Sequence, residues 1–204
     1  MRLADELYTT PAMARIWSGA AFVRGMLTFE AALARAEAGA GVIPGEAATA
    51  ITAACVGDPF EVPALLREAA VAGTPAIPLV RLLTERVGGE YGGYVHWGAT
   101  SQDAIDTAAV LQIRNGLDLL AARLLDAGGV CADLAERHRR TLMAGRTLLQ
   151  QALPIPFGLK AARWLALITR QGRALGELRE RISVVQLGGA AGTLAALGER
   201  GPLV

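Results

Sequence analysis

Residues 94–107 bring together side chains that can bind an anion or transfer a proton. The segment reads Tyr-Val-His-Trp-Gly-Ala-Thr-Ser-Gln-Asp-Ala-Ile-Asp-Thr, and its His96 is one of only two histidines in the 204-residue chain. A histidine can donate a hydrogen bond or transfer a proton near neutral pH. Thr100, Ser101 and Gln102 add hydroxyl and amide groups where a long helical pattern begins. Because the N-terminus of a helix attracts anions, the segment predicts a carboxylate-binding site.

The same residues also fit a purely structural role. Thr100 or Ser101 can cap the helix, and Asp103 stands where a first-turn carboxylate completes a capping box. A Thr-x-x-Asp pattern before an apolar run is most often only such a cap. His96 could likewise bond to the backbone and position the turn. Asp103 and Asp106 are better interpreted as caps or helix-packing partners than as acids.

A second group of polar residues lies in the connector over residues 141–153. Arg146 could hold a carboxylate through two parallel hydrogen bonds, with Thr147 and Gln150 beside it. A surface or interhelical ion pair is the alternative role for this arginine. His138 lies in the run Ala-Glu-Arg-His-Arg-Arg, which is typical of a solvated helix end.

The composition excludes several classes of protein. Apolar residues make up 52% of the chain and aromatic residues only 5%, which favours close-packed helices over sheets. The formal net charge of +1 gives no electrostatic reason to expect nucleic acid or an anionic membrane as a partner. The absence of a signal-peptide pattern and of a long apolar run predicts a soluble cytoplasmic protein. Cys55 and Cys131 lack the spacing of a metal site and are expected to be buried, reduced thiols.

Helices of two lengths are predicted to position these groups. Residues 1–17 are predicted to be irregular, because Pro11 limits helix extension. Four short helices, separated by proline and glycine, then form a small N-terminal domain over residues 1–95. They are predicted over residues 18–38, 44–56, 61–72 and 77–87.

The rest of the chain, over residues 96–204, is predicted to begin a central domain of long antiparallel helices. Apolar residues at steps of three and four predict helices over 101–140 and 154–187. Two such helices cannot bury their apolar faces alone, so helices from another chain or from further sequence must pack on them. The glycine-rich tail over 188–198 is no phosphate loop and is interpreted as a break between helices. The fold class is therefore all-α, with an incomplete bundle.

Three separated strings resemble, in the same order, signature segments of the fumarase/aspartase superfamily. They are His96–Thr107, residues 145–154 (Gly-Arg-Thr-Leu-Leu-Gln-Gln-Ala-Leu-Pro) and residues 188–198. Within the superfamily they look most like the bacterial 3-carboxy-cis,cis-muconate cycloisomerases, and the stretch Pro156–Trp164 adds to the match. The resemblance covers the chain from about residue 15.

The resemblance implies homotetramers with long shared helices and active sites assembled from three subunits. Such enzymes lactonise 3-carboxy-cis,cis-muconate during aromatic degradation through protocatechuate, without a metal or an organic cofactor. The expected partners are a small polycarboxylate and further copies of the chain. On this chemistry His96 and Ser101 are the candidate catalytic residues. The candidate substrate-binding residues are Thr100, Ser101, Gln102, Arg146, Thr147 and Gln150.

Two departures from the superfamily pattern narrow the prediction. Many adenylosuccinate lyases and fumarases carry a histidine where this chain has Leu148, and the histidine of an earlier loop is missing from residues 73–78. Both absences favour a cycloisomerase. Nothing in the chain matches the superfamily's Gly-Ser-Ser-x-Met-Pro-x-Lys-x-Asn loop, which supplies a catalytic serine. We therefore expect an N-terminal portion of a longer enzyme that is inactive alone.

Two other functions remain open. A related lyase could eliminate a leaving group from a substituted succinate, such as adenylosuccinate or nitrosuccinate, on the same scaffold. A non-catalytic helical assembly module would also contain long amphipathic helices. That module gives no reason for an anion-binding loop at the beginning of the longest helix.

Overall fold

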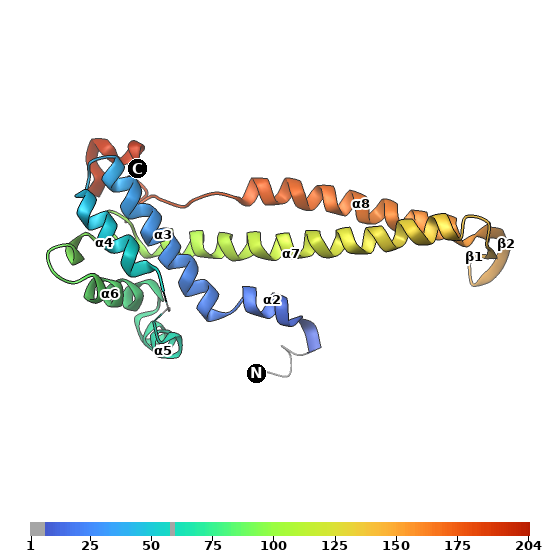
Figure 1. Cartoon of the computed structure of the whole chain (residues 1–204), viewed down its shortest axis with the longest axis horizontal. Helices are drawn as coiled ribbons and strands as arrows, with labels where there is room; N and C mark the ends of the chain where they lie inside the picture. Colours follow the sequence, from blue (N-terminus) through green and yellow to red (C-terminus); the bar gives the residue numbers. More distant parts are fainter. Residues whose placement is uncertain (1–6, 58–59) are drawn as a thin grey trace. The chain divides into compact units, whose positions relative to one another are not determined.

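A computed structural model gives the positions of residues 7–57 and 60–204. Contacts between segments divide the chain into two compact units (Figure 1). The first contains the residues up to Ile113 together with Ser183–Val204, and the second contains Arg114–Ile182. The chain therefore leaves the first unit once and later returns to it.

The first unit contains the four predicted short helices, each within one residue of its predicted ends. The side chain of Ser18 begins the first of them by accepting a hydrogen bond from the amide of Ala21 at 3.1 Å. Gly73 ends the third, because its φ of 75° is a left-handed conformation that glycine adopts without strain. The helices are α3 (Gly19–Gly39), α4 (Gly45–Cys55), α5 (Val62–Ala72) and α6 (Ala76–Val87).

The prediction of an irregular segment over residues 1–17 is wrong in part. Helix α2 covers Pro11–Ile16, and the Thr10 hydroxyl caps it by accepting a hydrogen bond from the amide of Met13 at 3.2 Å. Pro11 begins this helix rather than limiting it, because a first-turn residue needs no N–H donor. Residues 1–6 lie outside the described part of the chain.

An apolar core holds the short helices together. Gly25 of α3 lies against the beginning of the long helix α7 (Ser101–Arg137), where a Cβ on this glycine would be 3.0 Å from the Cβ of Ala108. This close approach places the buried face of α3 against α7, the helix that begins within the polar segment over residues 94–107. The largest apolar side chains with at most 1% exposure are Met26, Ile51, Leu65, Leu79 and Leu83.

The second unit contains the rest of α7 and helix α8 (Phe157–Ile182), which run side by side in Figure 1. Helix α7 begins at the predicted Ser101 and ends at Arg137 rather than Arg140. The guanidinium of Arg179 pairs with the carboxylate of Asp118, with Nη2 3.0 Å from Oδ2. The mostly helical fold class predicted from the sequence is confirmed.

A β-hairpin between these helices was not predicted. Strands β1 (Leu142–Thr147) and β2 (Gln150–Pro156) pair antiparallel, with Thr147 opposite Gln150. The two turn residues, Leu148 and Leu149, have φ values of 41° and 64°. Hairpin turns with two positive φ values usually contain asparagine and glycine, so two leucines gave no turn signal.

Helix α8 ends at Ile182, earlier than the predicted residue 187, and the chain then returns to the first unit. Thr107 of α7 fixes this return, because its hydroxyl accepts a hydrogen bond from the amide of Gln186 at 3.1 Å. The segment over 188–198 was predicted to separate two helices, but a 3₁₀ helix, η2 (Ala195–Leu203), already begins within it.

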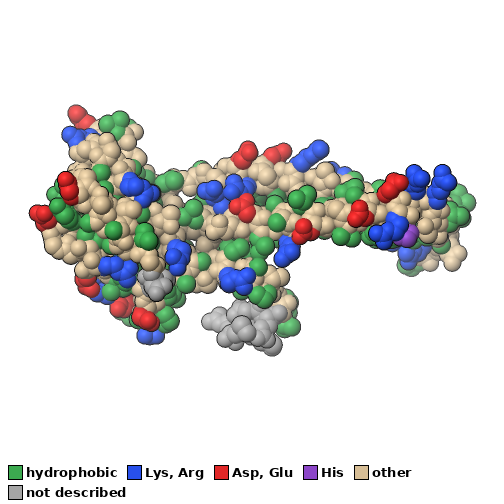
Figure 2. Space-filling view, in the orientation of Figure 1, with side chains coloured by type: hydrophobic (Ala, Val, Ile, Leu, Met, Phe, Trp, Pro, Cys, Tyr) green, Lys and Arg blue, Asp and Glu red, His purple; other side chains and the backbone are tan. Residues whose placement is uncertain are grey.

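Charged side chains of both signs are interspersed over the face shown in Figure 2, consistent with the small net charge. Cys55 and Cys131 are free thiols that are half-buried, so the prediction that both are buried is wrong. Burial, reinforced by the Glu30 carboxylate, raises the pKa of Cys55 to about 12. The division into domains over 1–95 and 96–204 stays a prediction.

Candidate functional site

The N-terminus of α7 is organised by Asp103. Its side chain is 1% exposed, and its Oδ2 accepts a hydrogen bond from the amide of Thr100 at 3.0 Å. The same carboxylate also accepts hydrogen bonds from the amides of Gly188 and Gly189, both at 3.0 Å. The predicted capping role of Asp103 is therefore confirmed. The carboxylate in addition fixes the glycine-rich tail against the polar segment, which the sequence did not indicate.

The other groups at this helix end differ in how they are engaged. The amide of Gln102 donates a hydrogen bond to Asp106 at 2.5 Å, so both side chains have a partner on their own helix. The half-buried hydroxyls of Thr100 and Ser101 make no hydrogen bond to any described residue. These two hydroxyls are therefore available to a ligand.

His96 is held by a buried carboxylate. Its Nδ1 lies 2.6 Å from Oε1 of Glu30, whose side chain is 1% exposed, while the His96 side chain is 13% exposed. His96 also has a φ of 60°, a left-handed conformation that is uncommon for residues other than glycine. The alternative prediction, in which the His96 side chain bonds to the backbone, is wrong. Its partner is a carboxylate from α3.

Glu30 was not among the residues predicted from the sequence, although a signal for it was present. Glu30 lies four residues after Met26 and seven before Glu37, on the buried face of α3. A carboxylate on an apolar helix face requires a partner, because burial of an unpaired charge is unfavourable. Glu37 is buried on the same helix, and neither of its carboxylate oxygens has a hydrogen-bond partner among the described residues. Burial, with the Glu30 charge as a second cause, raises the pKa of Glu37 to about 8.

The second group of predicted residues lies on the hairpin. Thr147 and Gln150 flank its turn and are exposed, and Arg146 precedes them on β1. Arg146 forms no ion pair with any described residue. It lines a pocket of about 230 Å³ between the hairpin and α8.

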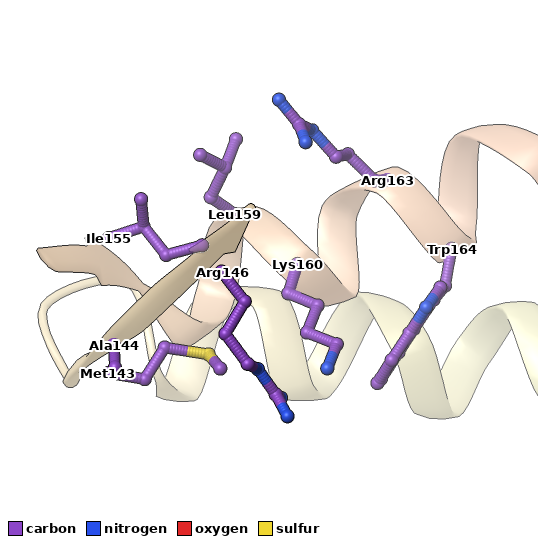
Figure 3. Close-up of a pocket in the computed structure, with 8 residues that line it drawn as sticks. All are labelled: Met143, Ala144, Arg146, Ile155, Leu159, Lys160, Arg163 and Trp164. Atoms are coloured by element: carbon purple, nitrogen blue, oxygen red, sulfur yellow. The ribbon is translucent and has the colours of Figure 1, made fainter. Parts of the chain in front are cut away.

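The pocket beside Arg146 is cationic. In Figure 3 the side chains of Arg146, Lys160 and Trp164 project to the same side, whereas Arg163 points away. The Lys160 ammonium lies 5.4 Å from the centre of the Trp164 ring, a favourable cation–π distance. The lining contains no aspartate or glutamate. Lys160, the only lysine in the chain, is thus a candidate anion-binding residue that was not predicted from the sequence.

The two groups of predicted residues belong to different units. The first unit contains His96, Thr100, Ser101 and Gln102. The second unit contains Arg146, Thr147 and Gln150. That the two groups of residues bind the same substrate in one active site stays a prediction.

His138 lies just beyond the end of α7, as predicted, with Nδ1 3.2 Å from the hydroxyl of Thr141. Within residues 7–57 and 60–204, no three His, Cys, Asp or Glu side chains are grouped to hold a metal ion. Every described helix is too short or too polar to cross a membrane.

The sequence and fold are similar to those of known enzymes. A sequence profile for the family described as "Lyase" matches residues 6–202. The chain is 48% identical over 202 residues to 3-carboxy-cis,cis-muconate cycloisomerase from Pseudomonas aeruginosa, covering 98% of this chain and 44% of that relative. It is 40% identical over 197 residues to trans-aconitate decarboxylase 1 from Mycosarcoma maydis, covering 97% of this chain and 40% of that relative.

A solved structure gives the same result. The 3-carboxy-cis,cis-muconate lactonizing enzyme from Pseudomonas putida superposes with a TM-score of 0.93 at 47% identity, covering 100% of this chain and 47% of that chain. The chain thus spans less than half the length of these relatives. Because the family profile matches nearly all of the sequence and the fold agrees, the chain belongs to the lyase family, on the predicted fumarase/aspartase superfamily scaffold.

Proposed function

We propose that this chain is the N-terminal portion of a cycloisomerase that lactonises 3-carboxy-cis,cis-muconate to 4-carboxymuconolactone. The similarity to cycloisomerases across nearly the whole chain carries this proposal. Carboxymuconate and trans-aconitate, for which two relatives are named, are both unsaturated tricarboxylic acids. A place in protocatechuate degradation, a cytoplasmic location and a homotetrameric assembly belong to the same proposal.

The reaction requires stabilisation of carboxylate charge. One substrate carboxylate oxygen forms a bond to an alkene carbon, and the π electrons move to the neighbouring carbon. The adjacent carboxylate delocalises this charge until a proton from solvent, delivered by an acid, completes the lactone. Fixed donors stabilise such developing charge best. The hydroxyls of Thr100 and Ser101, which make no hydrogen bond within the described part of the chain, can hold one carboxylate, and His96 can donate to the substrate or deliver the proton.

The hairpin supplies the complementary charge. Arg146 lacks an ion-pair partner in the described chain, and its pocket contains the Lys160 ammonium. An arginine can bind a carboxylate through two parallel hydrogen bonds. We propose that Arg146, Thr147 and Gln150 bind a second substrate carboxylate in an active site completed by neighbouring copies.

Two chains test this proposal. One is residues 1–204 alone, and the other is a chimera that adds the C-terminal half of the Pseudomonas aeruginosa relative. We expect no lactonisation by the first and measurable turnover by the second. In the chimera, Ser101→Ala and Arg146→Ala are each expected to lower kcat/KM by about 100-fold or more. Turnover by residues 1–204 alone would contradict the expected inactivity of this portion.

A lyase acting on a substituted succinate is the second candidate, because the same family includes relatives with other reactions. The chimera distinguishes the two candidates when both substrate classes are supplied. Elimination from adenylosuccinate without lactonisation would favour the lyase. Undiminished turnover in Ser101→Ala and Arg146→Ala would favour a helical module that contributes only assembly.

A further inference from the structure

The contact between Glu30 and His96 bears directly on which nitrogen of the histidine ring carries a hydrogen. Glu30 is 1% exposed, and its Oε1 lies 2.6 Å from Nδ1 of His96. Its other oxygen, Oε2, is buried without a hydrogen-bond partner among the described residues. His96 therefore provides the only hydrogen bond that the structure gives to this carboxylate, so removal of the ring would leave the carboxylate uncompensated.

With the Glu30 carboxylate as the acceptor, Nδ1 of His96 is the donor in this contact, because a carboxylate ion can only accept hydrogen bonds. The hydrogen bond at one ring nitrogen decides the role of the other. With Nδ1 protonated, Nε2 is the nitrogen that exchanges a proton or meets a ligand. No described residue forms a hydrogen bond with Nε2.

The backbone gives a second reason for this contact. His96 has a φ of 60°, and left-handed residues other than glycine persist only where surrounding contacts fix them. The Glu30 carboxylate comes from α3, which is anchored in the core and packs closely against α7 through Gly25. A rigid helix thus holds the ring of a loop residue.

We infer that Glu30 is a positioning residue, which holds His96 in its Nδ1–H form and leaves Nε2 free for proton exchange with the substrate. The part that concerns the substrate rests on the proposed function. The protonation form of the ring does not, so the two can be tested apart.

Nitrogen-15 NMR of the imidazole rings in residues 1–204 gives the direct test. The chain has only two histidines, and His138 serves as the internal reference because no described carboxylate forms a hydrogen bond or ion pair with its ring. At pH 8 we expect the Nδ1 of His96 to show the N–H signature. A ring with hydrogen only on Nε2 would overturn the inference, because Glu30 would then be a protonated donor.

Two variants on the same helix separate this role from general stability. Glu30→Met removes the acceptor and is expected to abolish the Nδ1–H preference of His96. Glu37→Gln changes the other buried glutamate of α3, whose carboxyl group has no hydrogen-bond partner among the described residues, and is expected to leave the His96 signals unchanged. An unchanged His96 spectrum in Glu30→Met would also overturn the inference. If that variant does not fold, the spectrum of the unsubstituted chain still shows which ring nitrogen of His96 carries the hydrogen.

The chimera tests the consequence for catalysis. Glu30→Gln keeps the shape of the side chain but removes its charge, and we expect kcat to fall about 10- to 100-fold while KM changes little. An unchanged kcat would overturn the role in proton exchange. If NMR finds the Nδ1–H form but the chimera does not lactonise carboxymuconate, the proposed function fails and the positioning of His96 stands.

Discussion

Glu37 is a carboxyl group whose protonation is coupled to folding. Its pKa is raised from 4.5 to about 8, so the folded state keeps a proton that the unfolded state releases above about pH 4.5. Between these two pKa values the folded chain binds more protons, and stability falls as the pH rises. The loss is complete above about pH 8. A buried, unpartnered carboxyl therefore makes the fold more stable in mild acid than in mild base.

We expect Glu37→Gln to remove this pH dependence. The free energy of unfolding should rise by about 1–3 kcal/mol relative to the unsubstituted chain at pH 8, because the neutral amide avoids the burial of charge. At pH 5 the difference should be much smaller. Urea unfolding at both pH values provides the measurement. An equal difference at the two values would show that Glu37 is not the titrating group.

Lys160 gives a chemical readout of the hairpin pocket, because it is the only lysine in the chain. We expect trans-aconitate or tricarballylate to slow its modification by an amine-directed reagent. A dissociation constant of about 1 mM would give roughly tenfold slower labelling at about 10 mM ligand. Mass spectrometry compares Lys160 with the N-terminal amine as the reference.

Substitutions in the same pocket control the Lys160 experiment. Arg146→Gln should remove the protection, whereas Arg163→Gln should retain most of it, because Arg163 points away from the other cations in Figure 3. Acetate at the same ionic strength should give little protection. Equal protection by acetate would indicate screening rather than a site for a polycarboxylate.

At the scale of elements, the predictable parts are those with local signals. Ser18 and Gly73 mark helix ends, and apolar spacing marks buried faces, so the short helices were predicted closely. The hairpin was not, because Leu148 and Leu149 occupy positive-φ positions without asparagine or glycine. The Glu30–His96 contact joins residues 66 positions apart, and no local pattern encodes such a pair.

The same signals limited the prediction of the site. Asp103 was identified as a cap from its spacing, whereas its bonds to Gly188 and Gly189 depend on how the returning chain packs. Lys160 was missed because its significance comes from the hairpin opposite it. Local chemistry thus predicted the candidate groups, and tertiary packing decided their partners.

We expect residues that adopt positive φ easily to stabilise the hairpin turn at positions 148 and 149. Replacing Leu148 with Asn and Leu149 with Gly supplies residues that adopt positive φ easily, and we expect about 1 kcal/mol of local stabilisation. Hydrogen exchange of the β1 and β2 amides should slow by roughly fivefold. Leu153→Asn, at another exposed leucine of the hairpin, is the control and should give no such protection. Faster exchange in the double variant would show that the two leucines stabilise the turn.

Asp103 should stabilise two elements at once. Asp103→Ala leaves the amides of Thr100, Gly188 and Gly189 without their acceptor, and we expect a loss of about 2–4 kcal/mol in the free energy of unfolding. Exchange of the two glycine amides should accelerate more than exchange within the α3 core. Uniform acceleration throughout the first unit would instead indicate global destabilisation.

At the scale of the whole molecule, the second unit exposes an apolar surface. A groove of about 600 Å³ between α7 and α8 is lined mainly by apolar residues, among them Leu124, Leu125 and Ile168. Leu125 is 78% exposed. The sequence predicted that these helices need further helices to cover them, and the groove is the surface that such helices would bury.

We expect this groove to mediate self-association. Leu125→Glu should raise the dissociation constant of self-association by roughly 10- to 100-fold, because burial of a leucine contributes about 1.5–3 kcal/mol. Sedimentation equilibrium of residues 1–204 provides the measurement. Val71→Glu, on α5, is the matched control, since Val71 is 91% exposed but lies outside the groove. Equal weakening by both variants would argue against the groove as the interface.

The hydrogen bonds between Thr107 and Gln186 have a consequence for how family members can diverge. They close the first unit on itself just inside the points where the polypeptide departs, after Ile113, and comes back, at Ser183. Everything between is an inserted arm in the topological sense. We therefore expect the small helical body and its Glu30–His96 contact to tolerate a change in the length of that arm.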